Sequence, residues 1–364
     1  MGNIDSRKKM LFITRKYPPS VGGMENGMYS MSRKMPDEKL DIDVIALGKS
    51  QKHLVWFLPY TVLYILIQAR KYDFLFLGDG LICICGKIAK KINPKIKRII
   101  ILHGLDISYK NILYQYYLRR NLISASDIYA CNSSYTENIA KKWGLKTKDG
   151  LCVIPHGIDS DKFTDCKTID REQFYDKYGI NKNDLLVITV GRLVKRKGVE
   201  WFIRNVLPKL SNVTYLVIGE GEERTSIENA IRETKVDKNV RLLGKISQDE
   251  LASCYLNSDI FVMPNIHVEG NTEGFGLVAL EASLAGLIVI ASDIDGIPDA
   301  VKNNKNGFLL ESRNSDIYTE KIKEVQENLE QYKKRAIEFQ KYTSENFVWE
   351  NTCKNFKDKL INMR

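Results

Sequence analysis

Two glutamates stand eight positions apart in the stretch VEGNTEGFGLVALEASLAG, residues 268–286. Glu273 precedes an apolar, helix-like run, and Glu281 lies about two turns further along it, on roughly the same side. The Gly-Phe-Gly between them lets a ligand approach the first amides of the helix, which lack intrahelical partners and attract anions. A carboxylate can accept hydrogen bonds from two adjacent hydroxyls. The pattern therefore indicates a ligand with phosphate in the middle and polyols at both ends, such as a nucleotide-sugar.

A plainer interpretation makes Glu273 a favourable charge at a helix start and Glu281 a solvated residue. It fits Glu273 acceptably, but it fits Glu281 badly because apolar residues surround that position. These neighbours are Leu280, Ala282, Leu284 and Ala285.

Basic residues crowd the turn after a strand-like run in VGRLVKRKG, residues 190–198. At the carboxyl end of a sheet such a cluster, with Arg192 and Lys197 among its four cations, can neutralise a diphosphate. Basic surface turns are also common, so this motif is not specific by itself. A second run ends in Gly-x-Gly within VIGEGEER, residues 217–224, which a tight turn explains equally well.

The first half of the chain offers two further candidates at strand ends. Gly22 and Gly23 follow the first strand-like run, where the backbone must come close to another group unless the loop is simply flexible. His103 is one of four histidines and ends a strand-like run in LHGLD, residues 102–106. The alternative for His103 is a purely structural histidine.

These residues need elements to position them, and eleven short apolar runs supply candidate strands. They span 10–14, 42–47, 73–78, 98–104, 127–132, 150–157, 185–191, 214–221, 240–244, 259–264 and 287–292. Near-continuous runs of Val, Ile, Leu and Phe between helix-like stretches predict an α/β protein with parallel sheets. The pattern occurs twice, on either side of a polar, strandless segment at 159–184. Ligands in such folds gather at the carboxyl ends of the strands, so two facing sheets would enclose a cleft.

Composition excludes several classes of protein. With 44% hydrophobic and 27% charged residues the chain is predicted to be globular, and it contains no run of 18 apolar residues. The seven cysteines are scattered, so we expect reduced thiols in a cytoplasmic protein, including Cys83 and Cys85 in a strand-like run. No secretory pattern opens the chain. Residues 1–6 fit the myristoylation pattern M-G-x-x-x-S, for which coincidence is the better interpretation.

The charge is uneven along the chain. Residues 1–180 hold 29 Lys and Arg against 18 Asp and Glu, whereas residues 181–364 hold 26 against 27. A basic half indicates an anionic partner, such as a membrane surface or a phosphate-bearing acceptor, unless it is only a solvated basic face. We expect no nucleic acid partner, since no recognised nucleic-acid motif is present.

Taken together, PPSVGGME, HGLD, PHGID, GRLVKRKG and EGFGLVALE resemble the retaining glycosyltransferases of family GT4. The resemblance covers nearly the whole chain, and the E-x7-E element is its most specific part. It implies a GT-B fold, with two Rossmann-like domains facing across a deep cleft. It implies an acceptor-binding domain at 1–168, a nucleotide-sugar-binding domain at 169–344, and a C-terminal helix at 345–364 that returns to the first domain.

The same resemblance assigns the second-domain residues. It implies that Arg192 and Lys197 bind the donor diphosphate, that Glu273 holds the donor sugar, and that Glu281 holds the ribose. It adds the backbone near Ile246 as a contact of the base. The helix-start residues that join Glu273 on the sugar are Gly274, Phe275, Gly276 and Leu277.

In the first domain, the resemblance implies that His103 lines the sugar pocket and that the loop of Gly22 and Gly23 closes over the diphosphate. One residue departs from the pattern, because many relatives have Asn where PHGID has His156. Any role for His156 is therefore open.

We thus expect a retaining, metal-independent glycosyltransferase that uses a nucleotide-sugar, with UDP as the expected nucleotide, and no cofactor. The Asp-x-Asp sequences at Asp41–Asp43 and Asp293–Asp295 lie outside the donor motifs of the family. The expected acceptor is a saccharide or lipid-linked saccharide of the cell envelope. Alternatives are a sugar-nucleotide epimerase or hydrolase of the same fold and, less favoured, a non-catalytic dinucleotide-binding protein. The latter lacks support because no G-x-G-x-x-G follows the first strand.

A membrane contact is the last expectation. The apolar, aromatic stretch 54–67, broken by Pro59, predicts an amphipathic or a buried helix. Basic residues lie close by in sequence: Lys71, Lys87, Lys90, Lys91, Lys95, Lys97 and Arg98. Together they favour a cytoplasmic enzyme held peripherally on the inner face of the plasma membrane. The alternative is that the apolar stretch belongs to the core.

Overall fold

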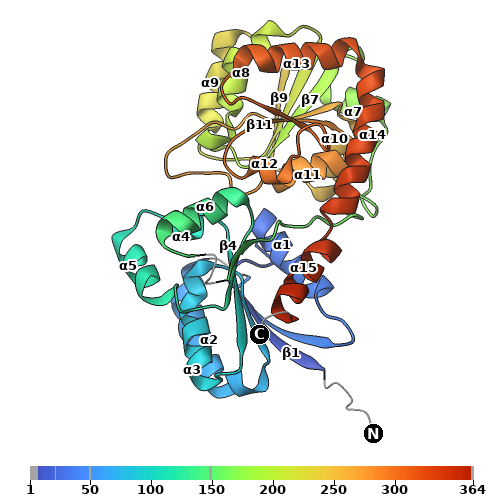
Figure 1. Cartoon of the computed structure of the whole chain (residues 1–364). Helices are drawn as coiled ribbons and strands as arrows, with labels where there is room; N and C mark the ends of the chain where they lie inside the picture. Colours follow the sequence, from blue (N-terminus) through green and yellow to red (C-terminus); the bar gives the residue numbers. More distant parts are fainter. Residues whose placement is uncertain (1–6, 21, 49–50, 147–149, 362–364) are drawn as a thin grey trace. The chain divides into compact units, whose positions relative to one another are not determined.

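The computed structural model describes residues 7–20, 22–48, 51–146 and 150–361 of the 364-residue chain. The chain forms two compact units, drawn in Figure 1. Unit 1 comprises Met1–Asp159 and Phe347–Arg364, and unit 2 comprises Ser160–Asn346. The hexapeptide that fits the myristoylation pattern lies outside the described residues.

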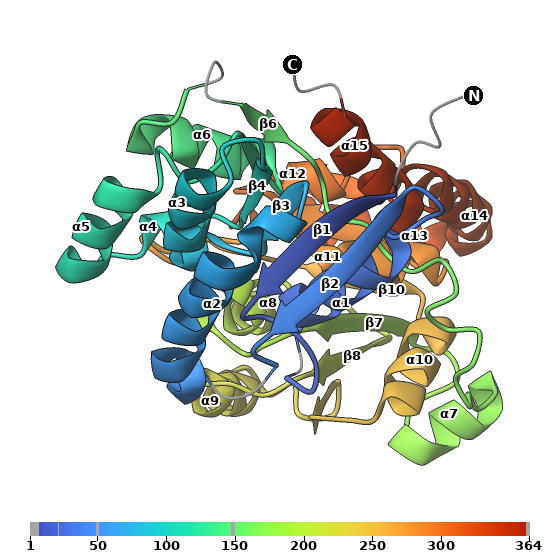
Figure 2. The ribbon, with the colours of Figure 1, turned by 90° about the horizontal axis from the view of Figure 1, so that it is seen from below.

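Unit 1 is built on a six-stranded parallel sheet with the order β2-β1-β3-β4-β5-β6. Its strands are β1 (Lys8–Thr14), β2 (Leu40–Ala46), β3 (Phe74–Leu77), β4 (Lys97–Leu102), β5 (Ile128–Cys131) and β6 (Leu151–Val153). Figure 2 shows β1 and β2 side by side, and Lys8 pairs with Leu40 at the start of their ladder. The central strands are apolar almost throughout because helices cover both faces.

The helices of unit 1 divide between the two faces of the sheet. They are α1 (Gly23–Lys34), α2 (Leu54–Gln68), α3 (Cys83–Ile92), α4 (Leu105–Ser108), α5 (Ile112–Asn121), α6 (Ser134–Trp143) and α15 (Trp349–Ile361). Residues of α1 and α15 pack with Phe12 and Phe76 on one face. Residues of α2, α3, α5 and α6 pack with Leu11 and Ile13 on the other.

The last helix confirms the predicted return of the chain. After α14 (Leu329–Asn346) completes unit 2, α15 packs within unit 1, where Trp349 and Phe356 are buried. The ring of Phe356 meets that of Phe76 edge-on at 5.4 Å. The two connecting segments bond to each other, since the amide of Ile158 donates to the carbonyl of Phe347 at 2.7 Å.

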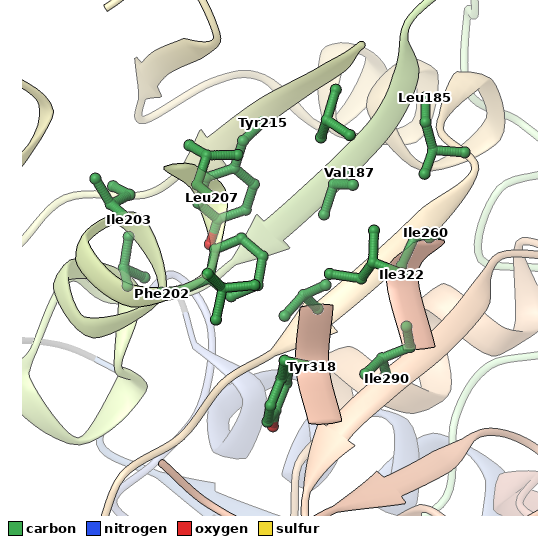
Figure 3. Packing of buried hydrophobic residues seen from close by; sticks show 14 of the residues in the cluster. Leu185, Val187, Phe202, Ile203, Leu207, Tyr215, Ile260, Ile290, Tyr318 and Ile322 are labelled. Carbon is green, nitrogen blue, oxygen red and sulfur yellow. The ribbon is translucent and has the colours of Figure 1, made fainter. Parts of the chain in front are cut away.

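Unit 2 repeats the architecture with the strand order β12-β11-β10-β7-β8-β9. Its strands are β7 (Leu185–Val190), β8 (Val213–Ile218), β9 (Val240–Gly244), β10 (Ile260–Met263), β11 (Ile288–Ser292) and β12 (Phe308–Leu310). Its helices are α7 (Arg171–Tyr178), α8 (Val199–Asn205), α9 (Arg224–Thr234), α10 (Gln248–Asn257), α11 (Leu277–Leu284), α12 (Ile297–Ala300), α13 (Ser315–Glu327) and α14. Figure 3 shows part of its core, where Phe202 and Tyr318 pack against strand residues such as Val187.

All eleven predicted strands form, and two details differ from the sequence analysis. Strand β12 was not predicted, because its three residues are too short for a recognisable pattern. Cys83 and Cys85 begin helix α3 rather than lying in a strand, because a short apolar run has no period that separates a strand from a buried helix. Both are free, buried thiols, as are most of the other cysteines.

Candidate functional site

A buried ion cluster surrounds Glu273, in the loop between β10 and α11. The side chain of Glu273 is 13% exposed, and its Oε2 lies 2.6 Å from Lys197 Nζ and 3.6 Å from Arg196 Nε. The same oxygen accepts a hydrogen bond from Asn265 Nδ2 at 3.2 Å. Burial alone would raise the pKa of Glu273, but the charges of Lys197 and Arg196 outweigh it, and the pKa falls below its ordinary value of 4.5. The carboxylate is therefore ionised at neutral pH.

Two loops are fastened together to build this cluster. The 3₁₀ turn Lys195–Lys197 follows β7, and its Arg196 carbonyl accepts a hydrogen bond from the amide of Ile266, after β10, at 2.9 Å. Gly198 closes the turn at a φ of 67°, and a Cβ there would lie 1.9 Å from the carbonyl oxygen of Pro264. Only glycine permits this approach, so the sequence K-R-K-G sets the place of Lys197 beside Glu273.

The predicted sugar-binding loop is held from its backbone. The amide of Glu273 donates to Asp295 Oδ2 at 3.0 Å, and its carbonyl accepts from the amide of Gly296 at 3.0 Å. Gly276 has a φ of 102° and precedes α11, whose first amides receive no side-chain cap. Uncapped helix-start amides beside an ordered carboxylate are the arrangement expected for a ligand with an anionic and a hydroxyl group. The assignment of Gly274, Phe275, Gly276 and Leu277 to a sugar stays a prediction.

Glu281 lies on α11 in a polar pair rather than in solvent. Its Oε1 is 2.5 Å from Lys162 Nζ, and its Oε2 accepts from the hydroxyl of Tyr255 at 3.1 Å. Its side chain is 16% exposed, so the interpretation of Glu281 as a solvated residue is wrong. Burial, and then the carboxylate of Glu281, raise the pKa of Tyr255 well above its ordinary value. The predicted contact with a ribose is not tested by this geometry.

The structure separates the two predicted diphosphate residues. Lys197 is buried against Glu273, whereas Arg192 is exposed on the same loop, and its side chain makes no hydrogen bond or ion pair to any described residue. Ile246, predicted near the base, follows β9 and is half-buried against the core. Both predicted roles remain predictions.

His103 is buried inside unit 1. Its Nε2 lies 3.0 Å from the carbonyl oxygen of Gly78, and its Nδ1 lies 3.4 Å from Nε2 of His156. The two rings stack with centroids 5.3 Å apart, and His156 also meets Trp349 edge-on. Burial, and then His103, lower the pKa of His156 to about 3, so this ring is neutral at physiological pH. The imidazole of His103 thus has partners on both nitrogens within unit 1, while its predicted place in the sugar pocket is untested.

The loop of Gly22 and Gly23 is also tightly built. A Cβ on Gly22 would lie 2.4 Å from Oε2 of Glu25, a buried carboxylate that pairs with Lys16 at 3.0 Å. A side chain at Gly22 would therefore displace the carboxylate of Glu25 from its place beside Lys16. Its predicted closure over a diphosphate stays a prediction.

Sequence reasoning missed three residues that the structure brings to the two glutamates. Asn265 lies beside Glu273, and Tyr255 and Lys162 hold Glu281. A lone lysine in a polar connection and a tyrosine on a neighbouring helix carry no local signal, because only the tertiary fold joins them. Among the described residues, no group of three or more His, Cys, Asp or Glu side chains is placed to hold a metal ion.

The lowered pKa of Glu273 predicts a pH-dependent stability. The ionised, paired carboxylate stabilises the fold at pH above its unfolded pKa, and this contribution is lost as the pH falls through the lower folded pKa. In Lys197→Met the main partner is gone, so burial raises the pKa of Glu273 and the loss of stability begins at a higher pH. Melting temperatures between pH 7 and pH 3 measure this. The exposed Lys195→Met is the matched control, and an unchanged profile in Lys197→Met would contradict the pairing.

Comparison with known proteins finds a family model that matches part of the chain. Residues 170–342 match the family model described as glycosyl transferases group 1. An uncharacterised glycosyltransferase of Methanocaldococcus jannaschii is 30% identical over 46% of this chain and 43% of its own length. A GDP-mannose-dependent alpha-(1-6)-phosphatidylinositol monomannoside mannosyltransferase of Mycobacterium tuberculosis is 26% identical over 61% of this chain and 58% of its own length. The matched part thus spans about half the length of these two relatives.

Two further similarities extend over nearly the whole chain. A GDP-mannose-dependent monoacylated alpha-(1-6)-phosphatidylinositol monomannoside mannosyltransferase of Corynebacterium glutamicum is 23% identical over 88% of this chain and 90% of its own length. The crystal structure of HepE from Anabaena in complex with UDP superposes with a TM-score of 0.78 at 18% identity, covering 98% of this chain and 100% of that one. Residues 170–342 therefore belong to the glycosyl transferases group 1 family, on a chain with the GT-B glycosyltransferase fold.

Proposed function

We propose that the chain is a retaining glycosyltransferase that moves a sugar from a nucleotide-sugar, with UDP as the nucleotide, to a saccharide or lipid-linked saccharide acceptor of the cell envelope. The observation that carries the proposal is the ionised Glu273, held between Lys197, Arg196 and Asn265 beside the uncapped start of α11. An acceptor-only carboxylate suits sugar hydroxyls, and cations with free amides suit a diphosphate.

In this reaction the chain must stabilise the negative charge that develops on the leaving diphosphate. Lys197 and the exposed Arg192 would stabilise the departing diphosphate, together with the helix-start amides. Retention with no assigned nucleophile suggests that departure and attack take place on the same face of the sugar, with a leaving phosphate oxygen accepting the proton of the acceptor. No metal is needed in this scheme, because protein cations supply the positive charge.

The similar proteins support the donor class and leave the nucleotide to experiment. The mycobacterial and corynebacterial relatives are named GDP-mannose-dependent, whereas the Anabaena structure contains UDP. We keep UDP as the expected nucleotide, and the donor screen decides between UDP and GDP.

A donor screen tests the proposal directly. The purified chain is incubated with UDP- and GDP-hexoses and a set of saccharide acceptors, and products are identified by mass and NMR. We expect one donor to give a product that retains the anomeric configuration, with the same rate in EDTA. Sugar-nucleotide turnover that is independent of any acceptor would instead indicate an epimerase or hydrolase, and activity lost in EDTA and restored by Mg²⁺ would overturn the metal-free scheme.

Substitutions of the two glutamates are expected to change different kinetic constants. Glu273→Gln should lower kcat strongly because Glu273 acts on the sugar, whereas Glu281→Gln should mainly raise the donor KM because Glu281 acts on the ribose. Lys197→Ala should cost about 2–4 kcal/mol of transition-state stabilisation, the usual scale for a preorganised charge. Steady-state kinetics and calorimetric titration with the free nucleotide measure these effects. Equal binding of the free nucleotide by wild type and Glu281→Gln would contradict the ribose assignment.

The surface of unit 1 supports a peripheral membrane contact. One face of α2, with Phe57, Thr61 and Ile65, is buried, and the opposite face is apolar and exposed, with Trp56 77% exposed. Exposed apolar residues of this face are Val55, Trp56, Tyr60, Leu63, Leu66 and Ile67. Helix α3 packs against both α2 and α5, and α5 adds Ile112 and Leu113, which are 87% and 80% exposed. No described helix is both long enough and apolar enough to cross a bilayer.

The charges of unit 1 fit an anionic surface. Unit 1 holds 29 Lys and Arg against 15 Asp and Glu, whereas unit 2 holds 26 against 30. One predicted contributor is wrong, because Arg98 is buried and paired with Asp127 at 2.8 Å. Exposed cations near the apolar faces include Arg70, Lys71, Lys91, Arg119 and Arg120. Each basic residue near an anionic bilayer contributes about 1 kcal/mol.

Liposome flotation at low and high salt tests this contact. Wild type is expected to float with anionic vesicles at low salt and not with neutral ones. The double variant Trp56→Ser, Leu63→Ser should lose binding, because it removes apolar burial, whereas the equally exposed Ile361→Ser should retain it. An active wild type that binds no anionic vesicles at low salt would overturn the membrane contact.

A further inference from the structure

Two buried polar atoms near Glu273 have no hydrogen-bond partner. Among the described residues, the buried side-chain nitrogen and oxygen atoms without a hydrogen-bond partner are Arg196 Nε and Asn265 Oδ1. Both side chains touch the same atom, Oε2 of Glu273. Buried polar groups are nearly always paired, and leaving one unpaired costs free energy. Two such atoms beside one carboxylate therefore call for a functional explanation.

The orientation of the Asn265 amide follows from the charge of Glu273. An ionised carboxylate only accepts hydrogen bonds, so the amide must turn its Nδ2 toward Glu273. Its Oδ1 then faces away from that oxygen and remains an unused acceptor. Arg196 Nε is an unused donor, since it lies 3.6 Å from the same carboxylate oxygen, beyond hydrogen-bond length. The cluster thus presents one donor and one acceptor.

Both residues are buried and are held at their backbones within the fold. Asn265 is 1% exposed, and its backbone carbonyl accepts a hydrogen bond from the hydroxyl of Ser312 at 2.8 Å. Arg196 is 7% exposed, and its Nη1 lies 3.4 Å from Oδ1 of Asn271. The hydrogen bond between the Arg196 carbonyl and the Ile266 amide fastens the two backbones together. Polar side chains carried on a backbone fastened in this way are suited to recognising one group of a ligand.

We propose that Arg196 and Asn265 recognise one hydroxyl group of the donor sugar and so determine which sugar is accepted. A hydroxyl both donates and accepts hydrogen bonds, so it can donate one to Asn265 Oδ1 and accept one from Arg196 Nε. The inference rests on the proposed function, which places the sugar at Glu273. A site built to pair with a hydroxyl strongly rejects the analogue that lacks it, because its buried groups are then left unpaired.

The test compares each donor hydroxyl in wild type and variants. The preferred nucleotide-sugar and its monodeoxy analogues are assayed by kcat/KM with wild type, Asn265→Ala and Arg196→Lys, after thermal unfolding has checked that each variant folds. Arg196→Lys keeps the positive charge beside Glu273 and removes Nε. Asn271→Ala is the matched control, because Asn271 contacts the same arginine and carries no orphan atom.

We expect wild type to lose on the order of 100-fold in kcat/KM with one deoxy analogue. For that analogue alone, the drop in kcat/KM relative to the full donor should shrink to below about tenfold in Asn265→Ala and in Arg196→Lys. In Asn271→Ala the drop should remain as large as in wild type. Variants that lose activity equally on all donors would overturn the inference and leave a structural role. A wild type that uses no nucleotide-sugar would instead overturn the proposed function, and this inference with it.

Discussion

Burying a carboxylate is the constraint from which the arrangement of unit 2 follows. An ionised Glu273 can be 13% exposed only because cations stand beside it, and these come from a different loop. The loop after β7 must therefore lie against the loop after β10, which requires glycine at Gly198. The strand order places β7 next to β10, so two turns far apart in sequence emerge at the same sheet edge. The sheet topology and the electrostatics of the cluster thus depend on each other.

Sequence patterns predicted the strands and the motif loops, because both depend on residues that are close together in the sequence. A run such as Leu185–Val190 must be a strand covered on both faces, and a glycine-flanked Glu273 must precede a helix. The pairing of Glu281 with Lys162 could not be predicted, since 119 residues separate them and neither position has a periodic signal. The two faces of α2 could not be told apart from the sequence either. One face is buried in the core and the other is exposed, but both are made of apolar residues.

The two units differ in net charge and in the chemistry of their surfaces. Unit 2 has a slight excess of acidic residues, and two of its cations, Arg196 and Lys197, are buried beside the carboxylate of Glu273. Unit 1 carries its excess of cations on the outside, together with exposed aromatic and aliphatic side chains on α2 and α5. Its buried polar residues, such as His103 and His156, are paired with each other and with backbone. Unit 2 thus holds the buried ion cluster of Glu273, whereas the exposed apolar and basic residues of the chain gather on unit 1.

The return of α15 to unit 1 also sets an order of events during synthesis. Unit 2 is continuous in sequence, so all of its strands and helices are available before the final residues leave the ribosome. The first segment of unit 1 is translated before unit 2, yet its sheet lacks Trp349 and Phe356 on one face until residues 347–364 have been made. The nascent first unit therefore exposes apolar strand residues such as Phe76 while the second unit is being made. Loss of residues 347–364 would leave unit 2 complete and the core of unit 1 open on one face.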